Sequence, residues 1–209
     1  MTLRLALVGD SIAFGQGAGR PRDRLAPRIE RGLTSAGIDV ATRVLAVPGA
    51  LSSGLAAQVD LALTWPPDVT VVVIGANDLT HRMRPAVAAA SLGDAVARLR
   101  GAGAEVVVAP APDLSVVPHV PEPLRAVIRD ASAALRDAQV RAVTAAGGRV
   151  ADGQATAETS FATDPALFSA DRFHPSSTGY AVIAAAVLPA VLAAAWHRFP
   201  SQPSGNRAP

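Results

Sequence analysis

Apolar and polar residues along the chain form a repeated two-part pattern. Short apolar runs rich in β-branched residues predict β-strands. These runs cover residues 3–8, 38–47, 69–74, 104–109 and 148–151. Between and after them, apolar residues recur at helical spacing, over residues 22–36, 52–64, 85–101, 121–146 and 175–196. Strands that alternate with helices in this way are typical of an α/β protein.

Two of the strand-like runs indicate how the sheet is covered. "VTVVVIG" at 69–75 and "AEVVVAP" at 104–110 are nearly continuous apolar runs, without the alternation of a half-exposed strand. Parallel strands that are covered by helices on both faces have this composition. We therefore predict an α/β fold, a three-layer α/β/α sandwich around a five-stranded parallel sheet.

Length and composition favour a single domain. The chain has 209 residues, 50% of them apolar, which is enough for one sizeable core. We expect this domain to cover residues 1–199. The last stretch, 200–209, is rich in Pro and Ser and has little to bury, so we expect a disordered tail there.

Charge and residue usage exclude several classes of protein. The formal net charge is only +2, and the 19 basic residues, all Arg, are scattered, so we expect no nucleic-acid partner. The absence of Cys excludes disulfides and Cys nucleophiles. The apolar run at the N-terminus is too short for a signal peptide, which makes a cytoplasmic location the expectation. The uncharged stretch 180–196 is short for a membrane span and contains Pro189, so we expect a buried helix and no stable membrane insertion.

Reactive and hydrogen-bonding residues follow the predicted strands. In a parallel sheet the carboxyl ends of the strands meet at one edge, where α/β proteins bind their ligands. In chain order, the residues at those positions are Gly9, Asp10, Ser11, Gly49, Asn77, Asp78, Asp113, Asp171 and His174.

Three of these residues have the chemistry of a catalytic triad. The Ser11 hydroxyl is a poor nucleophile unless a base takes its proton, and that base needs a third group to fix its tautomer. Asp171 and His174 are three residues apart in a predicted turn, so their side chains can meet. Pro175 suits the first helical position and would place His174 at the entrance of the last helix. If the three act together, the Ser11 hydroxyl must lie about 2.6–3.2 Å from the imidazole.

Three further groups could stabilise an oxyanion. Attack on an ester carbonyl places negative charge on its oxygen, which needs hydrogen-bond donors aimed at it. The candidates are the backbone N–H of Ser11, the backbone N–H of Gly49 and the side-chain amide of Asn77. Gly49 suits a position where the backbone must approach a ligand closely.

Together these segments resemble a known family. The chain is similar to the SGNH (GDSL-type) hydrolases in four blocks that occur in the same order. The blocks are Gly9-Asp10-Ser11, Gly49, Gly75-Ala76-Asn77-Asp78 and Asp171-Arg172-Phe173-His174-Pro175. The first block departs from the family's usual pattern, because Ile12 stands where Leu is common.

The resemblance implies a flavodoxin-like sandwich that hydrolyses esters or thioesters without a cofactor. It implies Ser11 as the nucleophile, His174 as the base and Asp171 as the residue that orients the base. It also implies Gly49 and Asn77 as oxyanion donors together with the Ser11 amide. The expected partner is a small-molecule ester, and no metal is expected.

Two other functions use part of the same pattern. A metal-dependent phosphoesterase could bind divalent ions through Asp10, Asn77, Asp78 and His174, although the upstream Asp-x-His of such enzymes is missing. A non-enzymatic, flavodoxin-like small-molecule binding module would need no convergence of these side chains. The motif G-x-S-x-G does not surround Ser11, and "GQGAGR" follows the first strand too late for a nucleotide-binding loop. The pocket is shaped by segments 79–84, 112–121 and 152–170. Their conformation decides which acyl group and which alcohol or thiol a substrate can carry, and whether the acyl group is hydrolysed or transferred.

Overall fold

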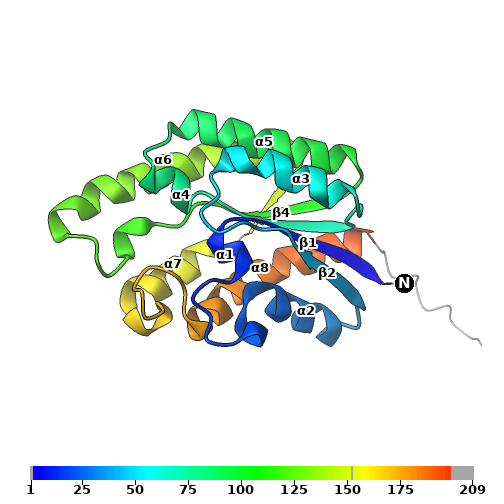
Figure 1. The fold of residues 1–209 in the computed structure, drawn as a ribbon, viewed down its shortest axis with the longest axis horizontal. Helices are drawn as coiled ribbons and strands as arrows, with labels where there is room; N and C mark the ends of the chain where they lie inside the picture. Colours follow the sequence, from blue (N-terminus) through cyan, green and yellow to red (C-terminus); the bar gives the residue numbers. More distant parts are fainter. Residues whose placement is uncertain (1, 152, 199–209) are drawn as a thin grey trace, which may run out of the picture.

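Five parallel strands form the middle layer of the computed structural model, which describes residues 2–151 and 153–198 (Figure 1). They are β1 (Leu3–Gly9), β2 (Val40–Val44), β3 (Val69–Val73), β4 (Glu105–Ala109) and β5 (Arg149–Val150). Their order in the sheet is β2-β1-β3-β4-β5. This is the strand order of flavodoxin-like folds, so the predicted fold class is confirmed. The tail expected at 200–209 lies outside the described residues.

Helices cover both faces of the sheet (Figure 1). One face carries α2 (Leu25–Ser35) and α8 (Ser177–Arg198), and the other carries α3 (Leu55–Leu63), α5 (Pro85–Gly101) and α6 (Glu122–Ala145). The shorter helices are α1 (Ser11–Phe14), α4 (Ala76–Thr80) and α7 (Gln154–Thr163). Four 3₁₀ turns complete the described elements, and they are η1 (Pro21–Asp23), η2 (Ser52–Gly54), η3 (Leu114–Val116) and η4 (Pro165–Leu167).

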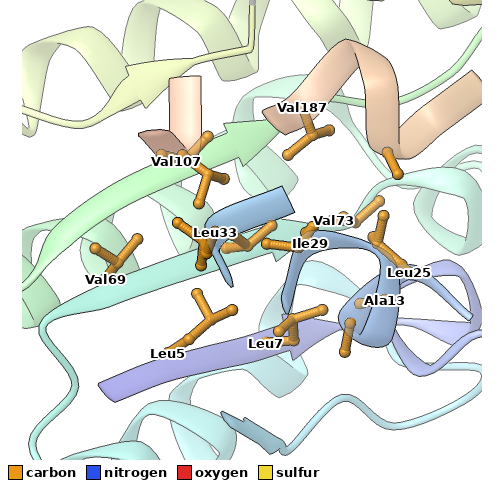
Figure 2. Close-up of a cluster of buried hydrophobic side chains, with 14 of the residues drawn as sticks. Leu5, Leu7, Ala13, Leu25, Ile29, Leu33, Val69, Val73, Val107 and Val187 are labelled. Atoms are coloured by element: carbon orange, nitrogen blue, oxygen red, sulfur yellow. The ribbon is translucent and has the colours of Figure 1, made fainter. Parts of the chain in front are cut away.

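The strands send side chains into two apolar layers. On one face, Leu5 and Leu7 of β1 belong to a buried cluster with Ile29 of α2 and Val187 of α8, which Figure 2 shows. On the opposite face, Val72 of β3 belongs to a second cluster with residues of α3, α5 and α6. Because successive side chains of a strand point to opposite faces, a strand between two helical layers buries side chains on both faces and is apolar at most positions. This explains the continuous apolar runs.

The sequence pattern misses the three short helices. α1 and α4 contain about one turn each, which is too short to show a 3.6-residue period. In α7 the apolar residues do not form one stripe, since Ala155 and Ala162 lie on a different side of the helix from Ala157 and Phe161. The strand expected over 38–47 is also shorter, because residues 38–39 and 45–47 lie outside β2.

α8 is long and apolar enough, by length and composition alone, to cross a membrane. Its residues Tyr180, Val187, Val191 and Ala194 are buried in the cluster that covers the sheet. Pro189 lies within this helix. α8 is therefore a core helix of the sandwich, which is the role expected from its sequence.

A buried glutamine fixes the carboxyl end of β1. The side chain of Gln58, on α3, is almost fully buried and binds both backbone groups of Gly9. Its Oε1 accepts the Gly9 N–H at 2.6 Å, and its Nε2 donates to the Gly9 carbonyl at 2.9 Å. The Gly9 carbonyl also accepts the N–H of Val47 at 3.0 Å. The turn that follows β1 is thus held from the helical layer behind it.

Replacing Gln58 tests this anchor. In Gln58→Leu the Gly9 carbonyl keeps the bond from Val47, but the buried Gly9 N–H loses its partner. We expect the free energy of unfolding to fall by about 1–3 kcal/mol, measured by urea denaturation with an unchanged m-value. Ala57→Leu, on the exposed side of the same helix, is the control and should change it by less than about 0.5 kcal/mol. An equal loss in both variants would contradict the anchor.

Candidate active site

Ser11 lies in a sharp turn at the carboxyl end of β1. Gly9 has φ +133°, and a Cβ there would lie 1.9 Å from the Val73 carbonyl oxygen, so only glycine fits. Asp10 caps α1, because its Oδ1 accepts the N–H of Ile12 at 2.9 Å. Ser11 is the first residue of that helix and is buried. The capping function that serine often has at a helix start therefore belongs here to Asp10.

The structure brings Ser11, His174 and Asp171 together. Ser11 Oγ lies 3.1 Å from His174 Nε2, within the expected distance, although 163 positions separate the two residues. His174 Nδ1 lies 2.6 Å from Asp171 Oδ2. An ionised carboxylate can only accept hydrogen bonds, so Nδ1 carries the proton in the neutral imidazole and Nε2 is free to accept the Ser11 hydroxyl. These two contacts have the geometry that a serine nucleophile, its base and a group that orients the base require.

Four donors surround the Asp171 carboxylate. His174 Nδ1 binds Oδ2, and Oδ1 accepts the N–H groups of Phe173 and His174 at 2.9 Å each and the Ser169 hydroxyl at 2.8 Å. Partial desolvation raises the pKa of Asp171, but the hydrogen bonds from His174, from the two backbone groups and from Ser169 outweigh it and hold that pKa well below its usual range. Asp171 therefore stays ionised beside the imidazole.

The segment after α1 packs directly against the histidine. Gly17 has φ +90°, and a Cβ there would lie 2.6 Å from the Pro175 carbonyl oxygen and 2.9 Å from His174 Cβ. The buried hydroxyl of Tyr180 donates to the Gln16 carbonyl at 2.7 Å and fixes the same segment. Gly17, the middle glycine of "GQGAGR", thus permits this close approach.

The loops that carry Gly49 and Asn77 are joined to each other. Gly49 lies in a turn closed by the bond from the Ala50 N–H to the Val47 carbonyl, and its φ is +81°. Asn77 Nδ2 donates to the Ala50 carbonyl at 3.0 Å. Because Val47 also binds Gly9, this turn connects the end of β1 with the start of α4.

The two remaining acidic candidates have structural partners. Asp78 is buried and accepts both the N–H and the hydroxyl of Ser52, with the hydroxyl at 2.7 Å. Asp113 Oδ1 accepts the N–H of Ser115 at 2.8 Å. Within residues 2–151 and 153–198, no three His, Asp or Glu side chains are grouped so as to hold a metal ion. The phosphoesterase alternative, which needs Asp10, Asn77, Asp78 and His174 around a metal, therefore finds no support in the arrangement of these residues.

Asp10 is the second unusual carboxyl group of the site. It is fully buried, and its Oδ2 has no hydrogen-bond partner among the described residues. Burial, with a smaller contribution from the charge of Asp78, raises the pKa of Asp10 to about 7. Asp10 is therefore largely neutral under mildly acidic conditions.

A cavity of about 120 Å³ opens beside the serine. Ser11 and His174 are among the residues that line it, and most of its wall is apolar, with contributions from Leu114, Phe161, Phe168 and Val187. The wall combines residues from the segment after β4 with residues of α7 and α8. The site therefore has a reactive end and an apolar interior.

Sequence reasoning did not identify Ser169, Gln58, Gly17 or Tyr180 as supporting residues. Gln58 does leave a signal, since it is a polar residue inside the apolar stretch of a predicted helix. Ser169, two residues before Asp171, has the spacing of a hydroxyl that can bond within a turn. Gly17 and Tyr180 depend on contacts between distant segments.

Comparisons with known proteins identify the family and the fold. The GDSL-like lipase/acylhydrolase family matches residues 7–182. The GDSL-like esterase Rv1075c of Mycobacterium tuberculosis (strain ATCC 25618 / H37Rv) is 40% identical over 186 residues, and the alignment covers 87% of this chain and 59% of that protein. The chain therefore spans less than two thirds of the length of this curated relative.

Two solved structures share the fold. TesA superposes with a TM-score of 0.76 at 19% identity, covering 91% of this chain and 99% of TesA. Axe2, an acetylxylan esterase from Geobacillus stearothermophilus, superposes with a TM-score of 0.69 at 18% identity, covering 90% of this chain and 93% of Axe2.

The raised pKa of Asp10 predicts a specific pH dependence of stability. Its ordinary value is 3.8, so between about pH 4 and pH 7 the folded protein holds a proton that the unfolded chain releases. The contribution of Asp10 to the free energy of unfolding therefore falls as the pH rises through this window and is constant above it. Asp10→Asn removes this loss. We therefore expect the free energy of unfolding of the variant, relative to that of the wild type, to rise by a few kcal/mol between pH 4.5 and pH 8.

Thermal unfolding of both proteins across this pH range is the measurement. Because all other titrating groups are common to both, their effects cancel in the difference. Asp39→Asn, which replaces an exposed carboxylate, is the control and should differ from the wild type by the same amount at each pH. If the stability difference between Asp10→Asn and the wild type were the same at every pH in this range, Asp10 would be ionised in the folded protein over the whole range.

Proposed function

The chain belongs to the GDSL-like lipase/acylhydrolase family, and from this we propose that it hydrolyses a carboxylic ester or thioester through an acyl-enzyme on Ser11. The observation that carries the proposal is the contact of Ser11 Oγ with His174 Nε2 at 3.1 Å. A hydroxyl at this distance from an unprotonated imidazole nitrogen can transfer its proton as it attacks.

The first half of the reaction acylates the serine. His174 Nε2 takes the hydroxyl proton while Ser11 Oγ forms a bond to the carbonyl carbon. When the tetrahedral intermediate collapses, the bond from carbon to the alcohol or thiol breaks, and the imidazolium returns the proton to the leaving atom. Asp171 supports this step, because its ionised carboxylate stabilises the positive charge on His174.

The second half removes the acyl group. A water molecule gives its proton to His174 Nε2 and attacks the acyl carbon, after which the bond to Ser11 Oγ breaks and the serine recovers its proton. An acceptor other than water would use the same acyl-enzyme and would make the protein an acyltransferase. The contact of Ser11 with His174 would serve hydrolysis and acyl transfer alike.

We assign the oxyanion contacts to the Ser11 N–H, the Gly49 N–H and the Asn77 amide. The links of the Gly49 turn to Gly9 and to Asn77 support this assignment, because they hold the three donors at one edge of the sheet. The Asn77 amide has two N–H donors. One binds the Ala50 carbonyl, and the other is the donor we assign to the oxyanion.

Ser11→Ala tests the nucleophile. We expect kcat on a p-nitrophenyl ester to fall by about 10³-fold or more, because the members of a triad act as a unit. Labelling by a fluorophosphonate should disappear as well. Ser35→Ala, at the exposed end of α2, is the control and should keep both. Undiminished hydrolysis by Ser11→Ala would refute the acyl-enzyme, and a wild type that neither hydrolyses esters nor is labelled would favour a binding module.

Asn77→Ala tests the oxyanion contact separately. Removal of one such donor is expected to lower kcat by about 10²- to 10³-fold. The pH profile of kcat should keep its shape, because the amide carries no proton in the reaction. A displaced profile with a normal rate would show that Asn77 acts on the base and not on the oxyanion.

A further inference from the structure

A second apolar cavity adjoins the one beside the serine. It has a volume of about 160 Å³ and lies between α4, the segment after β4 and α6. Leu79, His119, Ile128 and Phe173 are among the residues that line it. We call it the His119 cavity and the first one the Ser11 cavity. Ser11 and His174 line only the Ser11 cavity, whereas both cavities share the walls formed by Leu114, Val117 and Phe173.

The shared wall at Phe173 is part of the catalytic turn. The Phe173 N–H donates to Asp171 Oδ1, and its ring meets the His174 ring edge to face, with centroids 5.1 Å apart. The ring of His119 stacks on that of Phe173, with their centroids 5.9 Å apart. Phe173 is therefore fixed beside the imidazole, between the two cavities.

Neither cavity offers a set of polar groups for a sugar or a charged substrate. Besides Ser11 and His174, the polar residues of the Ser11 cavity are Asp113 and Glu158, which have partners in Ser115 and Arg136. The polar residues of the His119 cavity are Thr80 and His119. The remaining walls are apolar, so an apolar chain gains from contact with either cavity. Among the described residues, the walls of neither cavity hold a charged group that is free to pair with a charge on the substrate.

We propose that the two cavities hold the two sides of one substrate, an uncharged ester or thioester with apolar groups on both sides of the scissile bond. This inference rests on the proposed acyl-enzyme. The acyl group stays on Ser11 after the first step, so it occupies the cavity that Ser11 lines. The leaving oxygen or sulfur takes its proton from His174 Nε2, so the alcohol or thiol part leaves next to the His174 ring. The Phe173 ring contacts that of His174 and lines the His119 cavity, and we therefore place the alcohol or thiol part in that cavity.

Two alanines allow each cavity to be filled separately. Ala157 of α7 lines the Ser11 cavity, and Ala131 of α6 lines the His119 cavity. Ala162 and Ala134 lie on the exposed sides of the same helices and line neither cavity, which makes them matched control positions for the same substitution. The four variants are Ala157→Phe, Ala131→Phe, Ala162→Phe and Ala134→Phe.

Two ester series measure the effect. One series lengthens the acyl group of p-nitrophenyl esters from acetyl to octanoyl, and the other lengthens the alcohol of butyrate esters from methyl to octyl. We expect wild-type kcat/KM to rise along both series, by tenfold or more from the shortest ester to the best one. Ala157→Phe should abolish the rise along the acyl series only, and Ala131→Phe should abolish it along the alcohol series only. Both controls should behave as the wild type.

The outcomes separate this inference from the proposed function. Exchanged effects of the two variants, or a wild type that is indifferent to chain length in either series, would overturn the assignment while leaving a Ser11-dependent esterase in place. Loss of all hydrolysis and of fluorophosphonate labelling in the wild type would instead refute the proposed function. If a Phe variant fails to fold, Ile183→Ala and Ile128→Ala widen the two cavities, and each should move the best ester of its own series to a longer chain.

Discussion

The contact between Ser11 and His174 requires two segments that are 163 positions apart in the chain to meet at one edge of the sheet. Ser11 follows β1, which lies between β2 and β3, while His174 precedes the last helix. α8 can place His174 there only because it packs along the same face as α2. Two polar contacts fix its start, since Ser177 binds Arg28 through its carbonyl and Asp23 through its hydroxyl. The apolar core thus determines the geometry of the reactive groups.

The two carboxyl groups next to this contact have opposite environments. Hydrogen bonds keep Asp171 ionised, whereas burial favours the neutral form of Asp10. A negative charge beside the imidazole helps to stabilise its protonated form, but a second one beneath Ser11 would oppose the charge that develops on an attacked carbonyl. The difference follows from burial and from the donors that each group receives. Asp171 is partly exposed and has four donors, whereas Asp10 is fully buried, with the Ile12 N–H bound to its Oδ1 and no partner among the described residues for its Oδ2.

The sequence predicts the parts of the molecule that follow from local pattern or from order along the chain. The sheet is predictable because burial on both faces leaves continuous apolar runs, and the turn of Asp171 and His174 is predictable because the two residues are close in sequence. Gln58, Gly17 and Tyr180 are not, because each acts on a segment far away in the chain. The cavities also escape prediction, since α7 has no apolar stripe and its position depends on packing against α8.

Phe173 contacts both the proposed base and the two proposed substrate cavities. Any residue except proline at this position could supply the backbone N–H that binds Asp171, but the ring of Phe173 also contacts that of His174 and lines both cavities. A substitution of Phe173 would therefore alter the orientation of the His174 imidazole and the shape of both cavities at once. Leu79 and Ile128 pack in the same apolar cluster as Phe173, whereas Ala131 lines the His119 cavity and is not among the described residues of that cluster. In the proposed arrangement, a substitution of Ala131 therefore changes the His119 cavity with less effect on the turn of Asp171 and His174 than a substitution of Leu79 or Ile128.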